Sequence, residues 1–136
     1  MYIYINGQIL SKKEAVISPF DHGFMYGLGA FETFRTYNGF PFLIDEHIDR
    51  LHEALKELNI TAALNPDLVI GNVQTLLAKN ELDDAYFRLN VSAGAGDIGL
   101  QTDPYVKPAV ILFTKPLPKS GAVPEKELVK LETVRN

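Results

Sequence analysis

Two Asn-Gly pairs, Asn6-Gly7 and Asn38-Gly39, constrain the fold of this 136-residue chain more than any other feature. Both central residues of a tight type I′ turn need a positive φ, which Asn and Gly adopt most readily. Each pair stands between short runs rich in β-branched and aromatic residues, over residues 1–5 and 8–10 and over residues 31–37 and 40–44. The sequence therefore predicts two antiparallel β-hairpins.

Two later segments have the apolar spacing of amphipathic helices. Asp45 can cap a helix over residues 46–58, and Asn65 followed by Pro66 can open a second helix that ends near Asn80. Further strands are predicted over residues 86–93 and 109–113. Together these elements predict an α+β fold with a mostly antiparallel sheet and two helices. The predicted buried helix positions are three or four residues apart or adjacent, namely Ile48, Leu51, Leu55, Leu58, Val69, Val73, Leu76 and Leu77.

The composition changes after residue 115. Pro116, Pro118 and Pro124 stand close to lysine and glycine, which is typical of a linker. Residues 128–134 then alternate again between apolar and polar side chains, as a strand does. We therefore expect one domain over residues 1–115, a linker over 116–126, and the first strand of a second domain over 127–136.

Charge and composition exclude several classes of function. With 13 basic and 17 acidic residues the formal charge is −4, and no run of Lys or Arg forms a basic patch for nucleic acid. The absence of cysteine excludes a disulfide scaffold and a thiolate nucleophile. The N-terminus lacks the features of a signal peptide, and no apolar run reaches the roughly 20 residues of a membrane helix. We expect a cytoplasmic protein with neither nucleic acid nor a membrane as partner.

Two motifs match a functional pattern but stand in the wrong context. Gly94-x-Gly96-x-x-Gly99 has the spacing of a dinucleotide-binding fingerprint, yet Pro104 and Pro108 disfavour the helix that must open at its last glycine. We predict a mobile or ligand-covering loop there instead. His47 and His52 are five residues apart on the predicted helix, so their imidazoles diverge. We expect a solvated polar face there, and no metal site.

Five residues are candidates for binding, and two of them flank the glycine-rich segment 23–29. Arg50 borders the apolar stripe of the first helix, where an arginine either extends to solvent or binds a phosphate monoester. Arg35 and Arg88 fall in predicted strands, where each either faces solvent or lines a cleft for a carboxylate. Tyr26 and Phe31 flank the glycines and are either core aromatics or pocket walls. The residues alone leave these alternatives open.

Residues 21–35, DHGFMYGLGAFETFR, and residues 45–51, DEHIDRL, together closely resemble the class-IV aminotransferase family. The family pattern joins an aspartate, a Tyr-Gly step, a Phe-Glu strand and a later His-x-x-Arg-Leu. The resemblance covers essentially the whole chain and implies the N-terminal small domain of a fold-type-IV enzyme. Such enzymes use pyridoxal 5′-phosphate, and we expect a homodimer. The resemblance implies that Arg50 contacts the cofactor phosphate, and the candidates to line the substrate pocket are Tyr26, Phe31, Arg35 and Arg88.

Within the family, residues 18–24, 29–35 and 88–94 are most similar to aminodeoxychorismate lyases of the Bacillus type. This implies release of pyruvate from 4-amino-4-deoxychorismate to give 4-aminobenzoate for folate synthesis. Two other activities stay open. Branched-chain aminotransferases usually have glycine where this chain has Thr33, and D-amino-acid aminotransferases have Arg-Gly where we align Ala93-Gly94.

The family chemistry needs a lysine that joins the cofactor through a Schiff base. None of the nine lysines of the chain stands in a matching context, so we expect that lysine beyond Asn136. On this reading the parent protein is an enzyme, whereas the 136-residue chain alone is inactive and binds the cofactor weakly or not at all. An alternative of another class is a non-catalytic domain that associates with itself.

Overall fold

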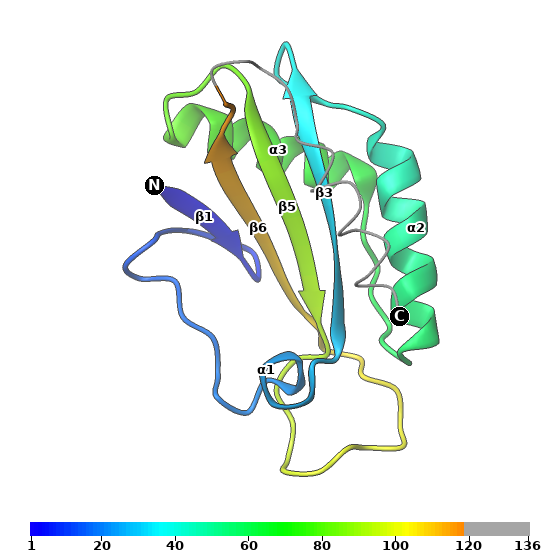
Figure 1. Cartoon of the computed structure of the whole chain (residues 1–136). Helices are drawn as coiled ribbons and strands as arrows, with labels where there is room; N and C mark the ends of the chain where they lie inside the picture. Colours follow the sequence, from blue (N-terminus) through cyan, green and yellow to red (C-terminus); the bar gives the residue numbers. More distant parts are fainter. Residues whose placement is uncertain (119–136) are drawn as a thin grey trace.

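The computed structural model describes residues 1–118, which form one six-stranded antiparallel sheet with three helices (Figure 1). The predicted α+β class and the mostly antiparallel sheet are confirmed, although the pattern predicted only the two longer helices. In the order β2-β1-β6-β5-β3-β4, the strands are Gln8–Ser11, Tyr2–Ile5, Ala109–Pro116, Ala85–Ser92, Gly29–Tyr37 and Phe40–Pro41. The helices are α1 His22–Tyr26, α2 Ile44–Glu57 and α3 Pro66–Lys79.

Both Asn-Gly pairs form hairpin turns, as predicted. The first pair joins β1 to β2 with φ values of 47° and 89°, and the second joins β3 to β4 with φ values of 51° and 79°. β4 contains only Phe40–Pro41 and is shorter than the predicted return strand over residues 40–44, because α2 already begins at Ile44.

The two long helices begin in different ways. Asn65 caps α3 as predicted, and its Oδ1 accepts a hydrogen bond from the backbone N–H of Asp67 at 2.8 Å. The prediction that Asp45 caps α2 is wrong. Ile44 is buried in the core and already belongs to the helix, so Leu43 takes the cap position with a left-handed φ of 54°. Asp45 lies instead in the first turn, where its negative charge interacts favourably with the positive end of the helix dipole.

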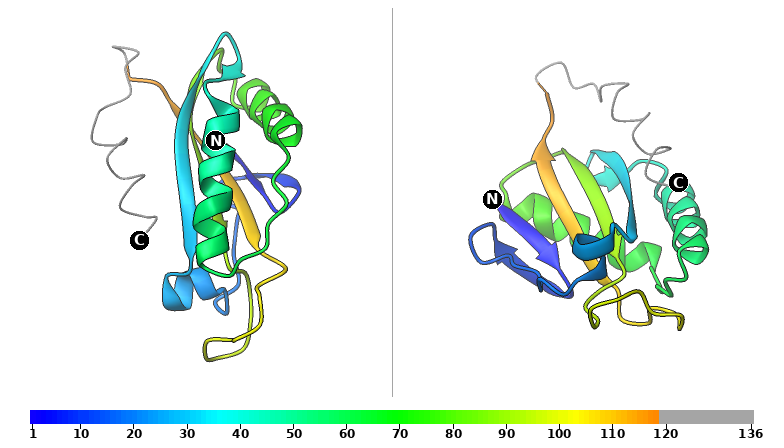
Figure 2. Two further views of the ribbon diagram at one scale, coloured as in Figure 1. Left: turned by 90° about the vertical axis from the view of Figure 1, so that its right-hand side faces the viewer. Right: turned by 60° about the horizontal axis from the view of Figure 1, so that its bottom comes forward.

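α2 and α3 pack on the same face of the sheet, here called the helix face (Figure 2). The alternation along β5 separates this face from the opposite one, here called the far face. Phe87, Leu89 and Val91 point to the helix face and belong to the core. Arg88 and Asn90 point to the far face. The core that they help to form also contains Phe34, Ile48, Leu51, Leu55, Val73 and Leu76.

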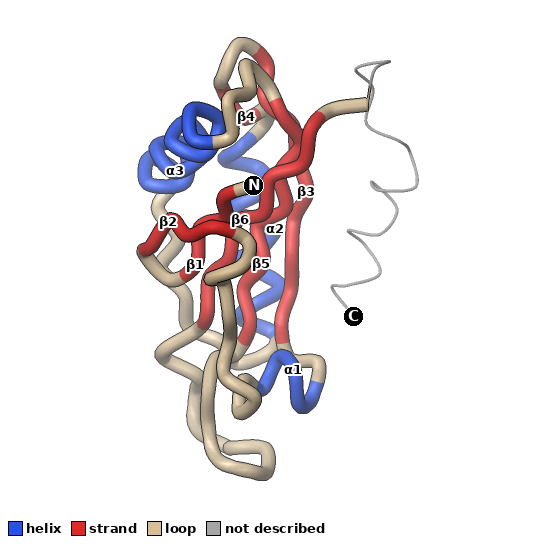
Figure 3. The backbone as a smooth tube through the Cα atoms, turned by 90° about the vertical axis from the view of Figure 1, so that its left-hand side faces the viewer, coloured by secondary structure: helices blue, strands red, loops and turns tan. Residues whose placement is uncertain are grey.

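The loop over residues 93–108 lies beyond one end of the sheet, beside α1 (Figure 3). No helix opens at Gly99 in this described segment, so the glycine triplet lacks the geometry of a dinucleotide site. Buried His22 joins α1 to the loop. Its Nε2 donates to the carbonyl oxygen of Asp97, and its Nδ1 lies within hydrogen-bonding distance of the Tyr105 hydroxyl, both at 2.7 Å. A ligand-covering role for this loop stays a prediction.

The predicted division into domains also stays a prediction. The described unit continues through the end of β6 at Pro116, and residues 119–136, which include most of the predicted linker and the following strand, lie outside the described residues. Within residues 1–118, no helix is both long and apolar enough to cross a membrane.

Candidate functional site

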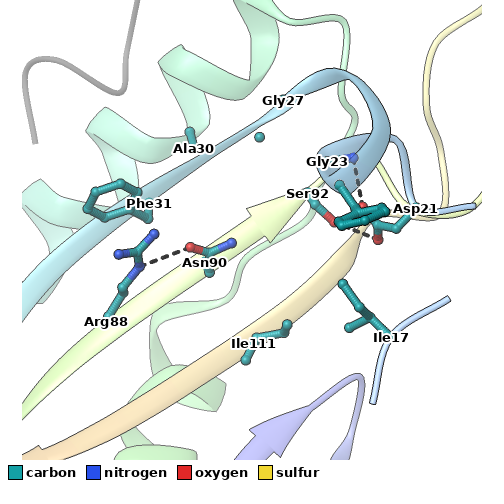
Figure 4. Close-up of a pocket in the computed structure, with 12 residues that line it drawn as sticks. Ile17, Asp21, Gly23, Gly27, Ala30, Phe31, Arg88, Asn90, Ser92 and Ile111 are labelled. Atoms are coloured by element: carbon teal, nitrogen blue, oxygen red, sulfur yellow. Dashed lines mark hydrogen bonds between the residues drawn. The ribbon is translucent and has the colours of Figure 1, made fainter. Parts of the chain in front are cut away.

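A depression of about 340 Å³ lies on the far face, between the ends of β3, β5 and β6 and the short helix α1 (Figure 4). It brings together two of the predicted site residues, Phe31 from β3 and Arg88 from β5. Its lining consists of Ile17, Asp21, Gly23, Phe24, Gly27, Gly29, Ala30, Phe31, Arg88, Asn90, Ser92 and Ile111.

The glycines allow α1 to lie directly against the end of β5. A Cβ atom at Gly23 would overlap the side chain of Ser92, and one at Gly29 would overlap the carbonyl oxygen of Val91. Asp21, which is 3% exposed, closes this end of the depression. Its Oδ1 accepts from the backbone N–H of Gly23 at 2.7 Å, and its Oδ2 accepts from the Ser92 hydroxyl at 2.9 Å. The close approach that the glycine spacing predicted is therefore between two segments of the chain itself.

Arg88 is held in a defined orientation at the other end of the depression. Its guanidinium carbon lies 3.7 Å from the centre of the Phe31 ring, a cation–π contact. Its Nε donates a hydrogen bond to Oδ1 of Asn90 at 3.1 Å. A guanidinium in this position can meet a carboxylate with its planar pair of N–H donors.

Thr33 and Arg35 follow Phe31 along the far face of β3. In the ladder with β5, Thr33 is directly opposite Arg88. Thr33 is only 3% exposed, and its hydroxyl oxygen has no hydrogen-bond partner among the described residues. Arg35 lies further from the depression, where its Nε donates to the carbonyl oxygen of Thr36 at 3.0 Å and its guanidinium stacks on Tyr37 at 3.9 Å.

Tyr26 does not line the depression. Its hydroxyl accepts a hydrogen bond from the backbone N–H of Gly99 at 2.6 Å, and its ring meets His22 edge-on with ring centres 5.0 Å apart. The structure thus places Tyr26 between α1 and the loop over residues 93–108, and separates it from Phe31 and Arg88.

Arg50 lies on the helix face, across β3 from the depression. Its Nε donates to both carboxylate oxygens of Glu32 at 3.0 Å, and its Nη2 donates to Oε1 at 2.6 Å. His47, one turn earlier on α2, donates from Nδ1 to the same Oε1 at 2.8 Å. The side chain of Glu32 is 1% exposed, that of His47 13% and that of Arg50 33%. The Glu32 carboxylate is therefore buried beneath the side chains of His47 and Arg50, and Arg50 is the most exposed of the three.

Opposing effects set the pKa of Glu32. Burial alone raises the pKa, but the hydrogen bonds from His47 and Arg50 and the positive charge of Arg50 outweigh burial and hold the pKa below its ordinary value. Glu32 is a site residue that the sequence reasoning missed. The available signal was the alternation of β3, which puts Glu32 on the helix face, together with the spacing of His47 and Arg50 on one side of α2.

The expected solvated face of α2 is confirmed for the acidic residues Asp45, Glu46, Asp49 and Glu53, which are exposed, but not for the two histidines, which are half-buried. His47 bonds to Glu32, and Nε2 of His52 accepts from the backbone N–H of Leu64 at 3.1 Å. The two imidazoles diverge, as the spacing predicted, and each forms a hydrogen bond within the protein, His47 to Glu32 and His52 to Leu64. Within residues 1–118, no cluster of three or more His, Cys, Asp or Glu side chains is placed to hold a metal ion.

A family model described as amino-transferase class IV matches residues 29–136. The aminodeoxychorismate lyase of Bacillus subtilis (strain 168) is 45% identical over 136 residues, which cover 98% of this chain and 46% of that protein. A putative branched-chain-amino-acid aminotransferase of Methanocaldococcus jannaschii is 43% identical over 118 residues, covering 87% of this chain and 41% of that protein.

Among solved structures, a branched-chain amino acid aminotransferase from T.th. with pyridoxamine 5′-phosphate matches 87% of this chain and 41% of its own, with a TM-score of 0.74 and 24% identity. That likeness concerns the fold. The chain spans less than half the length of each of these relatives.

The buried carboxylate of Glu32 makes a pH-dependent contribution to stability. Because its pKa is lowered by folding, the contribution is present above the unfolded pKa of about 4.3 and is lost as the pH falls through the lower folded value. We expect Glu32→Gln to lower the free energy of unfolding by about 2 kcal/mol at pH 7. The difference from the wild-type chain should shrink below about pH 4, as measured by urea unfolding between pH 3 and 8.

Glu57→Gln, at the exposed end of the same helix, is the matched control and should change the free energy of unfolding by less than about 0.5 kcal/mol. A Glu32→Gln deficit that stays constant from pH 7 to pH 3 would contradict the ion-pair interpretation.

Proposed function

Because the chain belongs to the class-IV aminotransferase family, we propose that its protein is a pyridoxal-phosphate-dependent aminodeoxychorismate lyase, which forms 4-aminobenzoate and pyruvate. The observation that carries this proposal is the pairing of Thr33 with Arg88 on the far face. A buried hydroxyl without a partner among the described residues stands opposite a fixed guanidinium, which suits a substrate that has both a carboxylate and further oxygen atoms.

The donor set around Arg50 fits the phosphate of the cofactor. The Arg50 guanidinium donates several hydrogen bonds to the buried carboxylate of Glu32, and one third of the Arg50 side chain remains exposed. In this proposal Arg50 binds the phosphate, and Glu32 and His47 fix the plane of the guanidinium. A preorganised guanidinium loses little conformational entropy when it binds a phosphate.

The chemistry that pyridoxal phosphate supplies when bound is an electron sink for the carbon atoms next to the substrate amine. The residues of this chain bind and orient the substrate. Arg88 meets a carboxylate, Phe31 forms a wall behind Arg88, and Thr33 donates or accepts a hydrogen bond. Arg35 makes a second, more distant contact with a carboxylate. Tyr26 holds the loop over residues 93–108 in place through its hydrogen bond with Gly99.

Proton transfer belongs in this proposal to a lysine, and none of the residues that line the depression is a lysine. The described chain therefore contributes binding and orientation to the proposed reaction.

A branched-chain aminotransferase is the second candidate, because the relative from Methanocaldococcus jannaschii is nearly as similar as the lyase. The two activities are distinguished by their products. The protein expressed from its complete gene should convert 4-amino-4-deoxychorismate to 4-aminobenzoate and pyruvate. Formation of glutamate from leucine and 2-oxoglutarate, without 4-aminobenzoate, would replace the lyase by the aminotransferase.

Arg50→Gln should weaken binding of pyridoxamine 5′-phosphate by roughly 10- to 100-fold, because it removes charge-assisted hydrogen bonds to the phosphate. Binding of pyridoxamine, which has no phosphate, should change little. Fluorescence titration of the two compounds measures both dissociation constants. Lys56→Gln removes the same charge from the same helix at an exposed position and should leave both constants unchanged. Equal effects of the two substitutions would contradict a specific role of Arg50.

Thr33→Val should lower 4-aminobenzoate formation by about tenfold or more, because the substrate loses one hydrogen bond in a buried site. The free energy of unfolding should stay the same or rise, since the hydroxyl has no partner among the described residues. Thr114→Val is the matched control. Its hydroxyl is also buried and unpartnered within residues 1–118, but it is opposite Phe87 on the helix face. If both variants reduce the rate equally, Thr33 has no specific role.

A further inference from the structure

Asn90 lies at the centre of the depression on the far face (Figure 4). In the sheet it is directly opposite Phe31 of β3 on one side and Ile111 of β6 on the other. We propose that Asn90 positions Arg88 and itself donates a hydrogen bond to a ligand that carries a carboxylate on an apolar ring. This inference rests on the proposed function, in which Arg88 binds the carboxylate.

The contact with Arg88 fixes the orientation of the Asn90 amide. A guanidinium has only N–H donors, so the atom that lies 3.1 Å from Nε of Arg88 must be the carbonyl oxygen Oδ1. The amide nitrogen Nδ2 then points away from Arg88, toward the Ser92 end of the depression. Its two N–H donors face the space in which a ligand would lie.

The same contact limits how Arg88 can meet a carboxylate. Nε is engaged by Asn90, and one face of the guanidinium is covered by Phe31 at 3.7 Å. A carboxylate therefore approaches the Nη edge, in the plane that Asn90 and Phe31 fix together. Without Asn90 the long Arg88 side chain would regain rotamers, and ordering it again would reduce affinity.

The charges along the depression give the ligand a direction. Arg88 and Ser92 are four residues apart on β5, about 13 Å along the strand. Ser92 donates to the carboxylate of Asp21, so the Ser92 end is anionic and the Arg88 end is cationic. A ligand carboxylate is attracted to Arg88 and repelled from Asp21. Between the two ends, Phe31 and Ile111 offer apolar surfaces for a ring, with the Asn90 amide between them.

The test compares 4-aminobenzoate with 4-aminobenzamide, which has the same ring without the charge, by titrating the full 136-residue chain and following its ¹H–¹⁵N NMR spectrum. We expect the wild-type chain to prefer the carboxylate. Asn90→Ala should weaken 4-aminobenzoate by about tenfold, because Arg88 loses its fixed orientation toward the carboxylate, and 4-aminobenzamide by much less. Asn90→Asp replaces the two donors by a negative charge beside Arg88 and should abolish the preference. A general loss of structure would weaken both compounds alike.

Three further variants, Asn90→Ser, Asn72→Ala and Arg88→Gln, make the result decisive. Asn90→Ser keeps a polar side chain in the strand but is too short to reach Arg88, and it should behave like Asn90→Ala. Asn72→Ala removes an amide on α3, on the other side of the sheet, and should bind both compounds like the wild type. Suppose that the Asn90 variants bind 4-aminobenzoate like the wild type, whereas Arg88→Gln binds it weakly. This result would overturn the role of Asn90 and leave the carboxylate site of Arg88 intact. A wild-type chain that shows no preference for the carboxylate would contradict both.

Discussion

Strand β3 pairs with β5 through seven residues in unbroken antiparallel register, from Gly29 opposite Ser92 to Arg35 opposite Tyr86. Because side chains alternate along each strand, this ladder decides on which side of the sheet every functional group lies. Glu32 and Phe34 face the helices, whereas Phe31 and Thr33 point to the far face. A shift of one residue would exchange the two sets, so the register is fixed by the apolar residues that the helix face must bury.

The ladder also connects the proposed phosphate site to the proposed substrate site through adjacent residues. Glu32 holds Arg50 on one side of β3, and its neighbours in sequence, Phe31 and Thr33, border Arg88 on the other. The buried carboxylate of Glu32 is compatible with the core only because Arg50 and His47 satisfy it. The same hydrogen bonds that compensate its burial thus also orient the arginine. In the proposed function, stability and phosphate binding therefore depend on the same ion pair.

The sequence alone predicted those features of the fold that depend on local chemistry. The hairpin turns follow from the positive φ of Asn-Gly, and the start of α3 follows from the capping oxygen of Asn65. The start of α2 was missed because the burial of Ile44 outweighs the local preference of Asp45 for a cap. Similarly, Glu32 was missed because its partners are 15 and 18 residues away, and only tertiary packing brings them together. Tyr26 stands next to the glycines in sequence, but its hydroxyl bonds to Gly99 instead of facing the depression.

In the proposed function, β3 separates two binding sites, one for a phosphate on the helix side and one for a carboxylate on the far face. The most direct measurement is a ¹H–¹⁵N chemical-shift map of the chain with pyridoxamine 5′-phosphate and with 4-aminobenzoate, each added alone. The phosphate compound should shift signals of Glu32, His47 and Arg50, and 4-aminobenzoate should shift signals of Phe31, Thr33, Arg88 and Asn90. Shifts from both compounds at the same residues, or shifts centred on α3, would contradict the claim.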